Sequence, residues 1–165
     1  MIRPMLLVIM ITVSASCGFF RPETSGGIIN VTLTADGDIN PNISGEAAPL
    51  RIMLFSLTDT EFFTESNYFD FTGRRQGSLQ NGITKLYDGV LTPGETRKLS
   101  LHITEQVAAI GVIGGYREIE HARWKSSVKL SPGWKPTVWR RLILPQHNAF
   151  YAHFQKSELT IGETE

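Results

Sequence analysis

Few side chains of this chain are of the types that catalyse reactions or bind metal ions, and their spacing in the sequence does not place them close together. The 165-residue chain has one cysteine, Cys17, and four histidines. His147 and His153 could share one face of an extended strand, but that separation places them about 20 Å apart, too far to hold one metal ion. His102 closely follows Ser100, yet no aspartate in sequence reach completes a hydrolytic triad. We therefore assign no catalytic residue and no metal ligand, and we expect no cofactor.

Sequence motifs of common enzymes are also missing. The chain has no phosphate-binding loop, nucleophile elbow, Cys-x-x-Cys pair or His-Glu-x-x-His helix. Glu118, Glu120 and His121 stand close together, but the pattern around them favours a solvated turn over an acid–base pair. The sequence therefore predicts a protein that is not an enzyme.

The position of Cys17 indicates a different kind of chemistry. Residues 5–13 are apolar and uncharged, Arg3 is the only charge before them, and three small residues lead to the cysteine. A cationic start, a short apolar run and a small-residue exit are typical of a secretory signal peptide. A helix of this run rises only about 13–14 Å, less than half of a hydrocarbon core, so it does not span a membrane.

The four residues that end in Cys17 resemble the lipobox of bacterial lipoproteins, which reads roughly Leu-(Ala/Ser)-(Gly/Ala)-Cys. Ala15 and Ser16 fit this pattern, and Ser14 stands where leucine is usual. The resemblance implies that residues 1–16 are a lipoprotein signal peptide, that Cys17 carries a diacylglyceryl thioether, and that its new amino group is acylated, for example with palmitate. The alternative is an ordinary secreted protein with a free thiol near its new terminus.

The segment after the cysteine predicts where the protein is held. Gly18 is not the aspartate that retains many lipoproteins in the inner membrane, so the resemblance points to the periplasmic face of the outer membrane. Residues 17–27 lack periodicity and contain proline, serine and glycine, which indicates a lipidated tether. Several acyl chains anchor a soluble domain stably, whereas one chain does so only marginally.

Length and charge limit the remaining possibilities. Residues 28–165 have the length of one domain, which buries about two thirds of its unfolded surface without needing disulfides. With Cys17 lipidated, no thiol remains for a disulfide. The chain has 16 Lys and Arg against 16 Asp and Glu, and this balance argues against nucleic acid, which requires a basic surface.

Most of the domain has the pattern of short β-strands. Apolar and polar residues alternate, or short apolar runs occur, between turn signals spaced 8–12 residues apart, which is typical of a two-sheet antiparallel β-sandwich. Pro93 and Gly94 predict a type II turn. Residues 59–71 are rich in aromatic residues and predict one or two short helical turns that pack on a sheet. The predicted strands are residues 29–33, 50–57, 83–91, 99–103, 107–116, 124–130, 138–144, 149–154 and 159–161.

One long connection does not fit the pattern of tight turns. Residues 35–49 form a loop of a length that is uncommon in a compact domain unless the loop is functional or disordered. The loop is acidic, with no basic residue, and its Asp-Gly, Asn-Pro-Asn and Ser-Gly sequences favour a shaped loop. The alternative that remains open is a solvated connection without a partner.

Tryptophans alternate with cations in residues 123–125 and 134–141. Such a pattern could stack nucleic-acid bases, but the export signal and balanced charge oppose that interpretation. A strand with tryptophan inward and cations outward explains it more simply. A partner surface remains an alternative, because tryptophan and arginine are common anchors at interfaces.

Several stretches, taken in order, carry a resemblance to a known family. They are residues 33–41 and 45–50 (an Asn-Pro … Gly … Ala-Pro-Leu passage), 52–59 (a strand ending in Leu-x-Asp), the Phe-rich 62–71, the Pro-Gly turn at 91–95, and the Gly-rich strand 110–117 with Trp124 downstream. In these features the domain resembles the outer-membrane lipoprotein of type VI secretion systems, the TssJ (SciN) family.

The resemblance implies a fold and a role. The fold would be all-β, a transthyretin-like two-sheet sandwich with a short helical insertion after the second strand. The role would be structural, namely binding the periplasmic domain of the inner-membrane IcmF-like subunit through the loop between the first two strands. We therefore expect partner-binding residues in that loop: Asp36, Asp38, Ile39, Asn40, Pro41, Asn42, Ile43 and Glu46.

An alternative from another class is a periplasmic lipoprotein that carries a small apolar ligand. A carrier needs an apolar cavity of several hundred Å3 inside its sandwich, whereas a partner-binding protein needs a filled core and a projecting loop. The structure can therefore distinguish the two hypotheses.

The lipid anchor leads to a direct test. A Cys17→Ser variant is expected to fold normally, because the thiol lies outside the domain, but to lose its outer-membrane location and abolish secretion. Membrane fractionation and a secretion assay measure these effects. Normal secretion by the unlipidated variant would contradict the lipoprotein hypothesis.

Overall fold

The computed structural model describes residues 26–72, 82–131 and 149–164. The signal peptide, Cys17 and the strand expected at residues 138–144 lie outside these ranges. In the described part, no helix has the length and hydropathy needed to cross a membrane. The elements are β1 (Gly26–Ala35), β2 (Leu50–Leu57), α2 (Glu61–Glu65), α3 (Tyr68–Thr72), β3 (Ile83–Leu91), β4 (Thr96–Thr104), β5 (Ala109–Gly114), β6 (Lys125–Lys129), β7 (Ala149–Phe154) and β8 (Leu159–Glu163).

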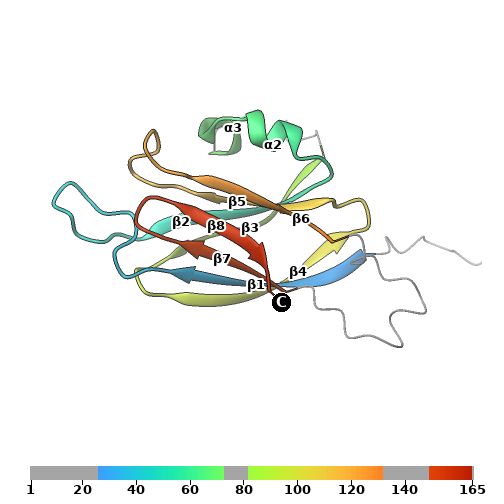
Figure 1. The fold of residues 1–165 in the computed structure, drawn as a ribbon, viewed down its shortest axis with the longest axis horizontal. Helices are drawn as coiled ribbons and strands as arrows, with labels where there is room; N and C mark the ends of the chain where they lie inside the picture. Colours follow the sequence, from blue (N-terminus) through green and yellow to red (C-terminus); the bar gives the residue numbers. More distant parts are fainter. Residues whose placement is uncertain (1–25, 73–81, 132–148, 165) are drawn as a thin grey trace, which may run out of the picture.

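The strands form two four-stranded sheets that face each other, and both helices cover the outer side of one sheet (Figure 1). One sheet has the order β4-β1-β7-β8 and the other β3-β2-β5-β6. The predicted β-sandwich with a helical insertion after β2 is thus confirmed. One pair departs from the antiparallel rule, because β7 runs parallel to β1. Alternation of side chains fixes which face of a strand is buried but carries no information about strand direction.

The core lies between the sheets and is filled by alternating side chains. Ile29, Val31 and Leu33 on β1 are buried, as their spacing predicted. On β2 nearly every residue is buried, because Ile52 and Leu54 belong to the cluster between the sheets while Met53, Phe55 and Leu57 belong to the cluster beneath the helices. This confirms β2 as a central strand with both faces covered.

Two aromatic residues of the helical insertion, Phe63 and Phe71, are buried in the second cluster. Phe63 and Phe71 lie with their ring centroids 5.4 Å apart, and each approaches Phe55 of β2, at 6.4 and 5.3 Å. Gly111 on β5 makes this packing possible, since a Cβ at that position would lie 2.7 Å from the Phe63 ring. The prediction that the aromatics of this segment are core residues is confirmed for Phe63 and Phe71, whereas Phe69 is 71% exposed and does not belong to the core.

One predicted turn and the start of β1 can be compared directly with the sequence predictions. Gly94 has a φ of 76° and the Glu95 amide donates to the Thr92 carbonyl at 3.1 Å, as expected of the predicted type II turn. Nearer the start of the chain, β1 includes the last two residues of the segment predicted as a tether. Gly26 and Gly27 belong to β1 and pair with Thr104 and Ile103 of β4.

Lys125 of β6 attaches the helical insertion to the sheet. Its ammonium donates to the carbonyls of Phe63, Thr64 and Ser66 at 3.1, 2.5 and 2.6 Å, and it lies 4.9 Å from the Trp124 ring centroid. Three donors thus meet three carbonyls at the end of α2. A helix as short as α2 is not stable alone, so this contact and the Phe63 packing together hold it in place.

Lys125→Met keeps the aliphatic stem but removes the three hydrogen bonds. We expect the free energy of unfolding to fall by about 1–3 kcal/mol, because the carbonyls lose a charged donor. Urea unfolding measures the change. Lys129→Met, on the exposed end of the same strand, is the control and should change it by less than about 0.5 kcal/mol. Equal effects of the two substitutions would show that Lys125 does not hold the insertion.

Candidate functional site

Four connections meet at one end of the sandwich (Figure 1). They are residues 36–49 between β1 and β2, the turn 92–95, the connection 115–124 after β5, and the turn 155–158. Backbone hydrogen bonds join them: the Gly94 amide donates to the Asp36 carbonyl, the Asn40 amide to Lys156, and the Arg123 amide to Ser157. The first of these segments, which we call the projecting loop (residues 36–49), reaches farthest from the sheets.

The base of the projecting loop is part of the core. Ile39 is fully buried, and Asn40 is 7% exposed. The Asn40 side chain donates to the Pro49 carbonyl at 2.9 Å and accepts from the Arg117 amide at 2.7 Å. Asn40 also has a φ of 46°, in the left-handed region that asparagine tolerates better than most residues. One buried carboxamide therefore joins both ends of the loop base and the neighbouring connection.

The tip of the projecting loop is closed by its own hydrogen bonds. The Asn42 side-chain oxygen accepts from the amides of Ser44 and Glu46 at 2.9 and 3.0 Å, and its nitrogen donates to the Glu46 carboxylate at 2.9 Å. Gly45, with a φ of 81°, completes the turn. These contacts confirm the prediction of a shaped loop. They leave Ile43 96% exposed at the tip.

The start of the projecting loop makes an ion-pair contact that the sequence analysis missed. The Asp36 carboxylate lies 2.7 Å from Nε2 of His153, with both side chains little more than one third exposed. The two residues meet because β1 and β7 are parallel and Thr34 pairs with His153. No local pattern indicates a contact across 117 residues, so only the sheet pairing could have found it.

The eight predicted partner-binding residues thus fall into three groups. Ile39 and Asn40 are buried in the loop base and position the loop. Asp36, Pro41 and Asn42 are partly buried. The residues that a partner can reach freely are Asp38, Ile43 and Glu46.

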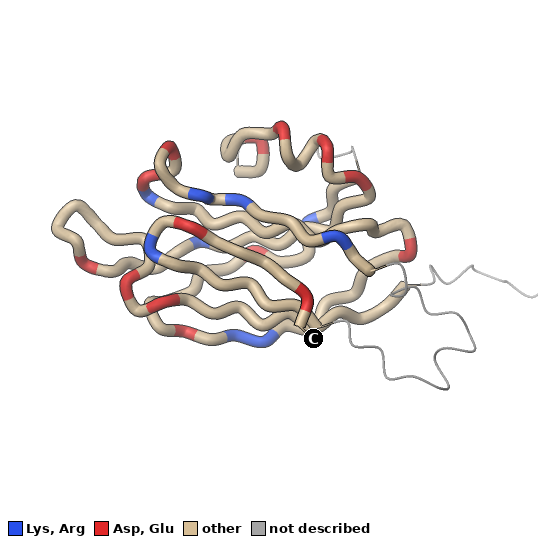
Figure 2. Tube along the Cα trace, viewed as in Figure 1, with Lys and Arg blue, Asp and Glu red and all other residues tan. Residues whose placement is uncertain are grey.

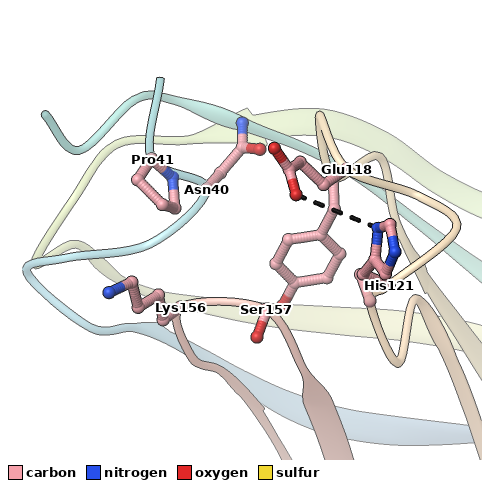
Figure 3. Close-up of a pocket in the computed structure, with 8 residues that line it drawn as sticks. Asn40, Pro41, Glu118, His121, Lys156 and Ser157 are labelled. Carbon is pink, nitrogen blue, oxygen red and sulfur yellow. Dashed lines mark ion pairs between the residues drawn. The ribbon is translucent and has the colours of Figure 1, made fainter. Parts of the chain in front are cut away.

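A cleft of about 290 Å3 lies beside the projecting loop (Figure 3). Its walls come from the loop base, from the connection 115–124 and from the turn 155–158. The Tyr116 hydroxyl donates to the Glu158 carbonyl at 2.6 Å, and burial raises the pKa of that hydroxyl. Glu118 and His121 form a loose ion pair at 4.0 Å on one wall. The lining residues are Asn40, Pro41, Tyr116, Glu118, His121, Ala122, Lys156 and Ser157.

Acidic residues are frequent in the connections at this end of the molecule (Figure 2). Glu95 is already paired, because the Thr92 amide and the Arg97 guanidinium bind its carboxylate and lower its pKa. In the described part of the chain, by contrast, the Asp38 carboxylate has no hydrogen bond or ion pair. Free carboxylates of this kind speed the approach of a cationic partner more than they hold it.

The described residues do not bring together any three His, Cys, Asp or Glu side chains that could hold a metal ion. The arrangement contains a filled core, a braced loop with an exposed apolar tip, and a small cleft with a mixed apolar and charged lining. Such an arrangement can bind a protein surface. The fold and site therefore define a β-sandwich with a braced loop and a cleft at one end.

Residues 28–148 match the family described as Type VI secretion lipoprotein, VasD, EvfM, TssJ. The chain belongs to this family of type VI secretion lipoproteins, as the sequence resemblance predicted. The family is structural and is not known for enzymatic activity. Comparison with curated protein sequences gives no match.

Solved structures share the fold. The T6SS lipoprotein TssJ1 from Pseudomonas aeruginosa is 22% identical, with a TM-score of 0.66 over 85% of this chain and 98% of that one. Serratia marcescens Lip, described as a membrane-bound component of the type VI secretion system, is also 22% identical, with a TM-score of 0.70 over 84% of this chain and 98% of that one. A structure described as the TssM C-terminal domain from EAEC is 16% identical, with a TM-score of 0.62 over 83% and 98%.

The role of Asn40 in the loop base can be tested by two substitutions. Asn40→Gly should lower the free energy of unfolding by about 1–3 kcal/mol, because the Pro49 carbonyl and the Arg117 amide lose a buried partner. Asn40→Ala should cost roughly a further 1 kcal/mol, since alanine disfavours a positive φ. Urea unfolding measures both. Asp38→Ala is the control and should have little effect; the same small change in all three variants would contradict this role.

Proposed function

We propose that this protein is an outer-membrane-anchored structural lipoprotein of a type VI secretion membrane complex, and that its projecting loop binds the periplasmic domain of the inner-membrane IcmF-like subunit. The observation that carries the proposal is the combination of a buried loop base with an exposed apolar tip. The base holds the loop in one conformation, so binding costs little ordering entropy. The tip offers Ile43, 96% exposed, as an anchor for a partner pocket.

The comparisons support a partner of this kind. Among the solved structures with this fold, one is described as the TssM C-terminal domain, and another, 16% identical with a TM-score of 0.64 over 82% of this chain and 97% of that one, as a type VI membrane complex. These descriptions suggest that the IcmF-like subunit is a TssM protein. Family membership supports the lipid anchor at Cys17, and Serratia marcescens Lip, which shares the fold, is described as membrane-bound.

The alternative function, a carrier of a small apolar ligand, has less support. The space between the sheets is filled by buried side chains of both sheets. The cleft beside the projecting loop opens to solvent, and its lining combines Pro41, Ala122 and Tyr116 with charged and polar side chains. Within the residues that the structure describes, this cleft is not the enclosed apolar cavity inside the sandwich that a carrier needs.

The experiment changes the tip alone, because Ile39 and Asn40 also support the core. Ile43→Asp in the detergent-purified lipoprotein should weaken binding of the detergent-purified IcmF-like subunit by about tenfold or more, as expected when an interface anchor is lost. Biolayer interferometry measures the affinity. Thermal unfolding should be unchanged, because the side chain makes no core contact.

Ile28→Asp is the matched control. Ile28 is 51% exposed and lies near the start of β1, whereas the projecting loop follows the end of that strand. This variant should bind like the wild type. If Ile43→Asp binds as tightly as the control, the loop tip is not the contact. If the wild-type lipoprotein does not bind the subunit at all, the proposed function is wrong.

A further inference from the structure

The cleft beside the projecting loop is separate from the loop tip and needs its own explanation. Three segments far apart in the sequence build it: residues 40–41, 116–122 and 156–157. Hydrogen bonds fix each wall. The Asn40 carboxamide holds the Arg117 amide at 2.7 Å, and the Tyr116 hydroxyl holds the turn 155–158 through the Glu158 carbonyl at 2.6 Å. The cleft therefore keeps its shape without an occupant.

The size of the cleft decides what class of occupant it can take. Its volume of about 290 Å3 lies at or below the lower end of the range for small-molecule pockets, roughly 300–1,000 Å3. A pocket of this size that opens to solvent suits one long side chain of a protein partner better than a free ligand. The adjacent projecting loop would bring such a partner to its rim.

The lining decides the chemistry of that side chain. Pro41, Ala122 and the Tyr116 ring offer apolar surface, against which an aliphatic stem can lie. Glu118 supplies a carboxylate, and its only ion pair within the described residues is the loose 4.0 Å contact with His121. Apolar surface beside a carboxylate with only this loose partner favours a guanidinium on an aliphatic stem, because a guanidinium forms strong hydrogen bonds to carboxylates.

Lys156 is the one cation in the lining, and its position is compatible with this occupant. Figure 3 shows Lys156 on the opposite side of the cleft from Glu118 and His121. Its side chain is exposed, so the ammonium can stay in water while a second cation binds at the Glu118 wall. Exposed carboxylates nearby, Asp38 and Glu46 on the projecting loop and Glu120 beside the cleft, favour the approach of a cationic segment.

We propose that the cleft receives one arginine side chain of the protein that binds the projecting loop, with its stem against Pro41 and Tyr116 and its guanidinium on the Glu118 carboxylate. The inference rests on the proposed function, because the same partner supplies the arginine. It extends that function by making the docking surface composite: the loop tip provides an apolar anchor, and the cleft provides a charged one.

The test uses the detergent-purified lipoprotein and IcmF-like subunit in binding assays. Glu118→Arg should weaken binding by about tenfold or more, the loss expected when a charge-assisted hydrogen bond at an interface becomes a repulsion. Ser157→Trp, at an exposed lining position, should weaken binding to a similar degree by filling the cleft. Glu105→Arg, in the turn between β4 and β5 at the other end of the sandwich (Figure 1), should bind like the wild type.

A second arm tests the nature of the occupant. Each arginine on the surface of the subunit is changed to glutamate, and one such variant should recover binding to Glu118→Arg while it loses affinity for the wild type. Circular dichroism and thermal unfolding confirm that all variants are folded. The inference is overturned if Glu118→Arg and Ser157→Trp bind normally while Ile43→Asp does not, or if no arginine variant restores binding; loss of binding by the wild type itself would instead refute the proposed function.

Discussion

The buried carboxamide of Asn40 is the contact on which the functional end of this molecule depends. Its oxygen and nitrogen satisfy two backbone groups, the Arg117 amide and the Pro49 carbonyl, that lie 77 and 9 residues away. An unsatisfied polar group at such a depth would be costly, and local electrostatics inside a protein make each of these bonds stronger than in water. The same amide therefore closes the projecting loop and shapes the wall of the cleft. The loop base behaves as an extension of the core, and only the tip is free for a partner.

The strands were predictable because alternation directly reports burial on one face of a strand. Residues 50–57, apolar on both faces, predicted a central strand, and helices cover its second face. Direction and distant pairing were not predictable, so the parallel β1–β7 pair and the contact of Asp36 with His153 were missed. The projecting loop was identified from its length and acidity, yet its residues were assigned to binding as one group. A loop has no regular periodicity from which burial can be predicted. The sequence therefore did not indicate that Ile39 is buried while Ile43, only four residues later, is exposed.

The packing of the sandwich explains why few of the described residues are available for contacts with a partner. Both faces of β2 are covered, one by the opposite sheet and the other by Phe63 and Phe71 of the helical insertion. Close packing of this kind leaves few alternative conformations, and Lys125 adds a fixed attachment of the insertion to β6. A rigid sandwich can hold its loops at one end in a constant arrangement.

The proposed lipid anchor would also lower the intrinsic affinity that the docking surface needs. Two proteins confined by membranes meet at a high effective concentration, so a modest intrinsic affinity gives a large bound fraction. A small surface is then sufficient, provided that its few contacts are well placed. Ile43 would supply buried apolar area, the cleft at Glu118 would supply a specific charged contact, and the carboxylates around them would raise the rate of encounter. Because each contact lies on a segment braced by Asn40 or Tyr116, binding would require little rearrangement, and most of the interaction energy would appear as affinity.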